Sequence, residues 1–177
     1  FGGGNWITSM QDTTPDFLEV RNFELSEGSF ITQRDLDTRD RVAVLGRTVV
    51  DNLFGEMSPI GQTISINKST FRVIGVLAPK GQSAGGQDQD DLIIVPLTTA
   101  QERMLGITYI HSISVQAESP EVIDQVQEDI TTLLRVRHRL QPGVPDDFSV
   151  RNLAAVMATA EATSGTITLL LGITAVI

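Results

Sequence analysis

Apolar and polar residues follow two kinds of pattern along the chain, one typical of strands and the other of helices. Residues 42–45 and 92–97 are apolar almost without interruption, as in strands that are covered on both faces. Residues 63–66 alternate with period two, and residues 67–70 predict a hairpin turn into the next strand. The strands that we expect lie at residues 5–10, 42–45, 63–66, 71–77, 92–97, 109–115 and 148–150.

Helix boundaries are predicted from capping residues and from apolar positions at helical spacing. Thr14 is expected as the N-cap of the first helix, with Pro15 at its first position. Thr99 is expected to form a capping box with Glu102. The longest helix should begin after Ser119, because apolar residues then recur at intervals of three and four. The expected helices cover approximately residues 15–20, 48–54, 99–105 and 120–139, and a further helix starts at residue 153.

This order of strands and helices predicts an α+β fold in which a middle segment is inserted into an outer unit. We expect residues 41–106 to form the inserted α/β subdomain. Residues 1–40 and 107–152 would form the two parts of the outer subdomain. Residues 33–41 carry charges of both signs and are expected to be a surface connector. Residues 153–177 would form a stalk and the start of a membrane helix.

The C-terminal tail is the most apolar part of the sequence. Residues 162–177 carry no charge, and residues 166–177 have the sequence TITLLLGITAVI. This run is shorter than the roughly 20 residues of a membrane span, so a buried helix is the alternative. We favour the opening of a membrane helix, because a soluble domain seldom ends on its most apolar segment. The chain starts at Phe1 without an initiator methionine, so we expect it to be a piece of a longer protein.

Charge and composition exclude several classes of function. The 177 residues include 13 Lys and Arg against 22 Asp and Glu, which gives a net charge of −9. This acidic balance, with a pI near 4.6, argues against a nucleic-acid binder and against docking on anionic lipid through a basic patch. The chain contains no cysteine, so disulfides, thiolate nucleophiles and cysteine-based zinc sites are excluded.

The candidate contact residues lie in a polar loop between two predicted strands. Residues 79–89 are rich in Gly and Gln without an apolar period, which predicts a mobile loop. Exposed loops often carry recognition. The partner-binding candidates in this loop are therefore Gln82, Gln87, Asp88, Gln89 and Asp90.

Evidence for catalysis in the sequence is weak. Asp88, Asp90 and Asp91 are the nearest approach to a metal site, but no glutamate follows at the distance that a calcium loop requires. The sequence contains no phosphate-binding loop, no zinc-protease motif and no nucleophile elbow. A small metal-dependent enzyme built on the three aspartates is kept as an alternative.

Several segments resemble the periplasmic core of MacB-type ABC transporter permeases. They include Asn52-Leu53-Phe54-Gly55 and the passage from the polar loop into Val95-Pro96-Leu97. The resembling segments are residues 14–21, 42–46, 48–50, 52–55, 59–64, 71–77, 79–101, 133–139 and 146–148. Their shared order covers nearly the whole chain and makes the resemblance specific.

The resemblance implies a periplasmic domain with a porter-like subdomain and an inserted α/β (sabre-like) subdomain. It places the domain on the periplasmic side of the Gram-negative inner membrane, attached through flanking helices. ATP and Mg²⁺ would bind a separate cytoplasmic domain, so this segment is expected to have no cofactor and no catalytic or metal-binding residues. The implied partners are a MacA-like periplasmic adaptor, a TolC-like outer-membrane channel and a second copy within the full-length transporter.

The implied function is mechanical, because ATP hydrolysis in the cytoplasm would move the periplasmic domains and export macrolides, peptides or toxins. The alternative within the same superfamily is a permease that releases lipoproteins or signals to cell-wall enzymes. The Gln82 to Gln89 loop is more similar to the drug-efflux branch, which ranks efflux first.

Overall fold

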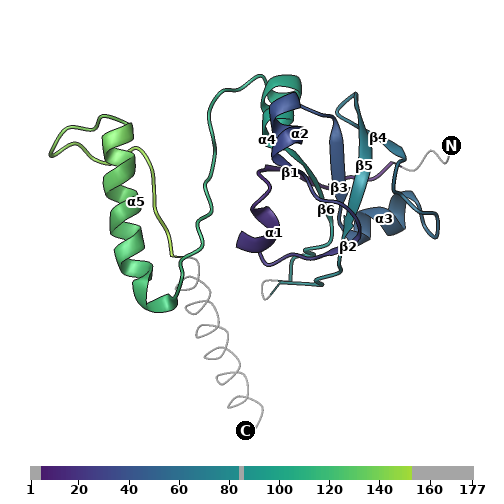
Figure 1. Ribbon diagram of the computed structural model, residues 1–177, viewed down its shortest axis with the longest axis horizontal. Helices are drawn as coiled ribbons and strands as arrows, with labels where there is room; N and C mark the ends of the chain where they lie inside the picture. Colours follow the sequence, from purple (N-terminus) through teal and green to yellow (C-terminus); the bar gives the residue numbers. More distant parts are fainter. Residues whose placement is uncertain (1–4, 84–85, 153–177) are drawn as a thin grey trace, which may run out of the picture. The chain divides into compact units, whose positions relative to one another are not determined.

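The computed structural model describes residues 5–83 and 86–152. The chain divides into two compact units, residues 1–114 and residues 115–177. In the first unit the strands are β1 (Ser9–Thr13), β2 (Leu25–Gly28), β3 (Val42–Leu45), β4 (Thr63–Ile66), β5 (Ser69–Leu77) and β6 (Leu92–Pro96). Its helices are α1 (Phe17–Val20), α2 (Gln33–Thr38), α3 (Arg47–Leu53) and α4 (Leu97–Ala100), and a π-helical turn at Gln101–Leu105 follows α4 (Figure 1).

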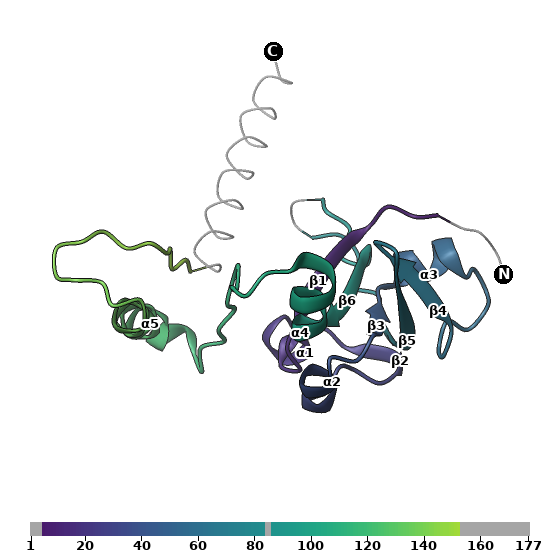
Figure 2. The same cartoon turned by 90° about the horizontal axis from the view of Figure 1, so that it is seen from above.

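One mixed sheet organises the first unit. Its strand order is β1-β6-β3-β5-β2, and β4 pairs with the other end of β5 (Figures 1 and 2). β1 is parallel to β6 and β3 is parallel to β5, whereas the β3–β6, β2–β5 and β4–β5 pairs are antiparallel. The sheet therefore ends at β1 on one side and at β2 and β4 on the other.

Two apolar clusters cover the two faces of this sheet. Ala43 and Leu45 of β3 pack in one cluster with Val49 and Val50 of α3, whereas Val44 packs in the other. The second cluster also contains Phe17 from α1, Phe30, Ile31 and Leu77. Successive strand residues point to opposite faces, so a strand buried on both faces must be apolar at every position. All residues of β3 and β6 are buried, which confirms the prediction made from their continuous apolar runs.

The second unit is built on the long helix that the sequence predicts. Ser119 precedes a 3-10 turn at Pro120–Val122, which leads directly into α5 (Ile123–Arg137). The Arg135 guanidinium pairs with Asp146 and donates to the carbonyls of Gln141 and Val144 at 3.1 Å. These bonds fold the loop that follows α5 back against the last turn of the helix.

Several predicted boundaries differ from the structure for local reasons. The first helix begins at Phe17 with Asp16 as N-cap, two residues later than expected from Thr14. α4 begins at Leu97, directly after Pro96, so Thr99 lies inside the helix and does not form the expected capping box. Its hydroxyl is buried and donates to the Asp40 carbonyl at 2.9 Å.

The charged connector predicted at residues 33–41 contains a helix, α2. Thr32 and Asp35 form a reciprocal capping box, in which the Asp35 backbone N–H bonds the Thr32 hydroxyl and the Thr32 backbone N–H bonds the Asp35 carboxylate. The cap satisfies amide groups that a short polar segment would otherwise leave to water.

Two predicted strands are absent from the described residues. Residues 109–115 and 148–150 are extended or bent but pair with no strand there, and Ile110, Ile113 and Val115 are exposed. A period-two pattern makes a strand only where a neighbouring strand supplies hydrogen-bond partners.

The sheet also runs across the boundary that we expected between residues 40 and 41. β1 and β2, from the first 40 residues, pair with β6 and β5 in the same sheet. The structure instead divides the chain between Ser114 and Val115. The predicted stalk and membrane helix at residues 153–177 lie outside the described residues. Within residues 5–83 and 86–152, no helix has the length and apolar character needed to cross a bilayer.

Candidate functional site

The loop between β5 and β6, which carries all five predicted contact residues, is held by the buried carboxylate of Asp90. Its Oδ1 accepts the Lys80 backbone N–H and its Oδ2 accepts the Gly81 backbone N–H, both at 2.8 Å. Asp90 is only 7% exposed. Both carboxylate oxygens thus bind the opposite side of the loop, so Asp90 positions the loop and is not available to a partner.

Asp88 fixes the same loop to helix α3. Its Oδ2 accepts the Thr48 hydroxyl at 2.7 Å, and its Oδ1 accepts the Asp90 backbone N–H at 2.9 Å. The Asp88 side chain is at the surface, but both of its carboxylate oxygens accept hydrogen bonds from within the molecule. A partner that bound Asp88 through these oxygens would have to compete with both bonds.

The tip of the loop carries the exposed side chains. Gln82 and Asp88 form an isolated antiparallel bridge, and the Ser83 backbone N–H donates to the Gln87 carbonyl at 2.8 Å. Gln82 and Gln87 are exposed and Gln89 is partly exposed. In its described residues the loop is a hairpin that main-chain hydrogen bonds close. Gln82 and Gln87 remain the amide groups that this hairpin presents to solvent.

The metal-site alternative finds no support in this geometry. Asp90 turns inward to backbone N–H groups, and Asp91 Oδ1 accepts the indole N–H of Trp6 at 2.8 Å. In residues 5–83 and 86–152, no three His, Asp or Glu side chains are grouped closely enough to hold a metal ion.

Lys80 is a residue of this site that the sequence did not predict. Its ammonium donates to the carbonyls of Arg21 and Asn22, at 2.8 and 3.1 Å, and lies 4.2 Å from the centre of the Phe23 ring. A cation at the end of a helix satisfies the free carbonyls there. Lys80 thus ties the loop to the end of α1. No local pattern indicates this contact, because Arg21 and Asn22 precede Lys80 by 59 and 58 residues in the chain.

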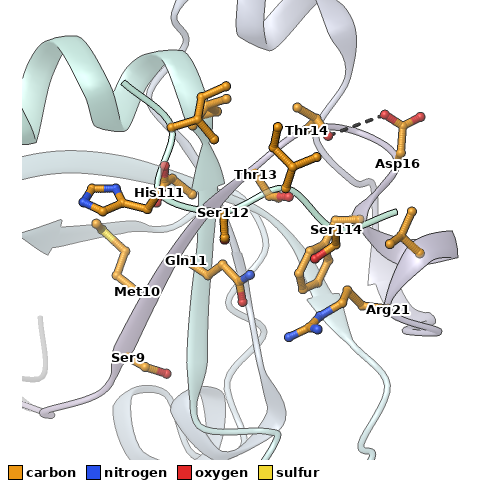
Figure 3. Close-up of a pocket in the computed structure, with 16 residues that line it drawn as sticks. Ser9, Met10, Gln11, Thr13, Thr14, Asp16, Arg21, His111, Ser112 and Ser114 are labelled. Carbon is orange, nitrogen blue, oxygen red and sulfur yellow. Dashed lines mark hydrogen bonds between the residues drawn. The ribbon is translucent and has the colours of Figure 1, made fainter. Parts of the chain in front are cut away.

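A cleft of about 570 Å³ lies next to the edge strand β1 and α1. All five residues of β1 line it, and so do residues 110–114 of the extended segment that was predicted as a strand (Figure 3). The lining is completed by residues of the α1 region and by one residue of α4: Thr14, Asp16, Phe17, Val20, Arg21 and Leu97. No local pattern in the sequence indicates this cleft, because its walls lie about 100 residues apart in the chain.

Comparison with known proteins identifies the family. The profile described as "MacB-like periplasmic core domain" matches residues 1–133. The chain belongs to the family of MacB-like periplasmic core domains. The family assignment confirms the resemblance seen in the sequence and places the domain in the periplasmic part of an ABC transporter permease.

Curated relatives of this MacB-like domain share more than a third of its residues. The macrolide export ATP-binding/permease protein MacB of Chlorobium phaeobacteroides is 38% identical over 97% of the chain. The protein of the same name from Bdellovibrio bacteriovorus is 40% identical over 94% of the chain. The chain spans 26% of the length of each of these relatives.

Two solved structures have the same fold as this MacB-like domain. The periplasmic region of MacB from Actinobacillus actinomycetemcomitans matches with a TM-score of 0.67 and 24% identity, covering 86% of this chain and 64% of that one. The extracellular domain of the noncanonic ABC-type transporter YknZ from Gram-positive bacteria matches with a TM-score of 0.69 and 20% identity, covering 86% and 74%. These likenesses confirm the predicted α+β class.

Proposed function

We propose that this domain is the periplasmic part of an exporter that couples cytoplasmic ATP hydrolysis to the expulsion of substrates from the periplasm. The observation that carries the proposal is the 38–40% identity, over nearly the whole chain, to proteins named as macrolide export ATP-binding/permease proteins. The chain corresponds to about a quarter of those proteins, so ATP and Mg²⁺ would bind elsewhere in the transporter.

This domain would transmit movement and would bind a partner protein. A sheet covered on both faces moves as a stiff body, because close-packed cores transmit displacement. The loop between β5 and β6 is closed on itself by Asp90, tied to α3 through Asp88 and tied to α1 through Lys80. A partner that held the tip of this loop would therefore be moved together with the sheet.

The proposed partners are a MacA-like adaptor, which would meet Gln82 and Gln87, and a TolC-like outer-membrane channel beyond it. Gln89 is a weaker candidate because it is partly covered. The transporter would work as a dimer on the periplasmic side of the Gram-negative inner membrane. Glutamine amides both donate and accept hydrogen bonds. Gln82 and Gln87 could therefore bind backbone groups or polar side chains of the adaptor, whether or not these carry a charge.

Susceptibility to a macrolide tests this function. The full-length gene that encodes the chain is expressed, with and without the adaptor gene from its own operon, in a Gram-negative host whose own macrolide exporters have been deleted. The proposal predicts that the inhibitory concentration of erythromycin rises only when both genes are present. A rise without the adaptor, or no rise with it, would contradict an adaptor-dependent macrolide exporter.

Variants at the loop tip locate the contact. The double variant Gln82→Ala/Gln87→Ala should lower resistance towards that of the host without the gene, at unchanged protein level. Gln62→Ala is the matched control, because Gln62 is an exposed glutamine in the turn before β4, away from this loop. Equal resistance in the double variant and the control would show that Gln82 and Gln87 do not contribute to adaptor binding.

A further inference from the structure

The cleft beside β1 has two extended walls with unused backbone hydrogen-bonding groups. In the described part of the chain β1 pairs only with β6, so its outer edge faces the cleft. In the same residues, no backbone–backbone hydrogen bond engages residues 110–114 of the opposite wall. Unpaired N–H and C=O groups along an edge strand are a template for a further strand.

The size of the cleft suits a short extended segment. A strand of five residues, the length of β1, spans about 17 Å at roughly 3.3 Å per residue. The volume of about 570 Å³ falls in the range of pockets that enclose a ligand. Ser9 and Thr13 lie near the two ends of one wall, and Ser112 and Ser114 come from the other (Figure 3).

The side chains around the cleft indicate which sequences would fit. Ile110 and Ile113 are 55% and 67% exposed, so apolar side chains of a ligand would cover surface that now faces water. The lining includes two carboxylates, of Asp12 and Asp16, and one guanidinium, of Arg21. Among the described residues, no ion pair or hydrogen bond engages the Asp12 carboxylate, which leaves it free to pair with a cation.

We propose that this cleft binds an extended peptide carrying alternate apolar residues and a lysine or arginine, which adds as a strand between β1 and residues 110–114. Main-chain hydrogen bonds to both walls would supply the affinity, and Asp12 would favour the basic residue. Several classes of peptide-binding domain recognise their ligands by adding a strand to an exposed sheet edge. The proposal does not rest on the transport function, because the binding can be measured on the isolated chain.

Backbone recognition is tested with a pair of peptides that have identical side chains. The probe is a fluorescent peptide of about seven residues, alternating valine and threonine around a central lysine, matched to the usual length of a strand. The control peptide is N-methylated on alternate residues, so that one edge has no N–H donors. Binding to the 177-residue chain is followed by fluorescence anisotropy, and the contact is located by amide chemical-shift changes.

The expected result is saturable binding with shifts confined to residues 9–13 and 110–114. Because each lost hydrogen bond weakens a complex several-fold, N-methylation should reduce affinity by about tenfold or more. Ser112→Pro removes one N–H donor from the wall and should weaken binding, whereas Gln116→Pro, also in an exposed irregular segment but outside the cleft, should not. Asp12→Asn should weaken the lysine peptide more than the same peptide with glutamine at that position.

Three outcomes would overturn the proposal. The N-methylated peptide could bind as well as the parent, which would make the contact independent of the backbone. Shifts could map elsewhere on the chain. Hydrogen exchange of the free chain could show residues 110–114 and β1 already protected by each other, in which case the cleft is closed by the chain itself.

Discussion

Removing the Asp90 carboxylate should destabilise the first unit through the loop that the carboxylate holds. Asp90 accepts two backbone N–H groups at 2.8 Å while almost completely buried. Asp90→Ala leaves the N–H groups of Lys80 and Gly81 without this acceptor. Asp90→Asn keeps one oxygen acceptor but turns an NH₂ donor towards one of the two N–H groups.

The magnitude follows from these two bonds. A hydrogen bond to a charged group contributes about 1.5–3 kcal/mol, so two such bonds are worth about 3–6 kcal/mol. Water can reach the loop once the side chain has been truncated, which favours the lower end, about 3 kcal/mol for Asp90→Ala. Asp90→Asn should cost about 2 kcal/mol, because roughly half of the interaction is kept.

Urea denaturation followed by tryptophan fluorescence measures this loss. Trp6 is the single tryptophan, and its indole bonds Asp91 beside the loop, so its emission reports on the first unit. At a slope of about 2 kcal/mol/M, the midpoint for Asp90→Ala should fall by about 1.5 M. The control Asp51→Asn breaks an exposed ion pair with Arg47 and should cost less than about 1 kcal/mol. A loss for Asp90→Ala no larger than that of the control would refute the anchoring role.

Three further changes test other parts of the structure. Gly46→Ala places a Cβ 2.1 Å from the Asp90 carbonyl oxygen and should lower the free energy of unfolding by about 1–3 kcal/mol in the same urea assay; an unchanged midpoint would contradict the close approach. The pKa of Glu121 is lowered, first by a hydrogen bond from the Ser119 side chain and then by its own backbone N–H. Ser119→Ala should therefore raise the pKa of Glu121 towards its ordinary value of 4.5 in an NMR titration. The parent should lose stability as pH falls through the lowered pKa of Glu121 in the folded state, and the variant should lose less. A pKa that does not move would exclude the Ser119–Glu121 hydrogen bond. Arg135→Met should speed amide exchange in the loop after α5 without speeding it in β3, because the guanidinium bonds Asp146, Gln141 and Val144 of that loop. Equal protection in the variant and the parent would show that the loop is held by other contacts.

Local patterns were sufficient where burial is decided by nearby residues. The apolar run at residues 42–45 identified a strand with both faces covered, and Ser119 with Pro120 placed the start of the long helical segment correctly. In both cases the deciding interactions lie within a few residues or follow from the period of the element itself.

Local patterns failed where the deciding contact is distant. β2 has polar residues at Ser26 and Glu27, and it is a strand because the end of β5 pairs with it. Residues 109–115 have a strand-like alternation but no strand partner in the described part of the chain. The helix at residues 33–38 could have been predicted from its capping residues, Thr32 and Asp35. The many charged residues that follow favoured a surface connector instead.

The candidate site was predicted in composition but not in geometry. The polar loop lies where the sequence placed it. Asp90, however, is buried and holds the loop, and the exposed Asp88 bonds Thr48, whereas Gln82 and Gln87 are exposed with their amide groups towards solvent. A sequence shows that an aspartate lies in a polar loop, whereas its partners, the backbone N–H groups nine and ten residues earlier, depend on how the hairpin closes.

Affinity purification of the full-length transporter from membranes tests the central claim most directly. The transporter that contains this chain should be recovered with a periplasmic adaptor and an outer-membrane channel. The Gln82→Ala/Gln87→Ala variant should recover less of both, and Gln62→Ala should recover as much as the parent. Recovery of a lipoprotein carrier or a cell-wall hydrolase in place of the adaptor would contradict the efflux function and leave the fold unchanged.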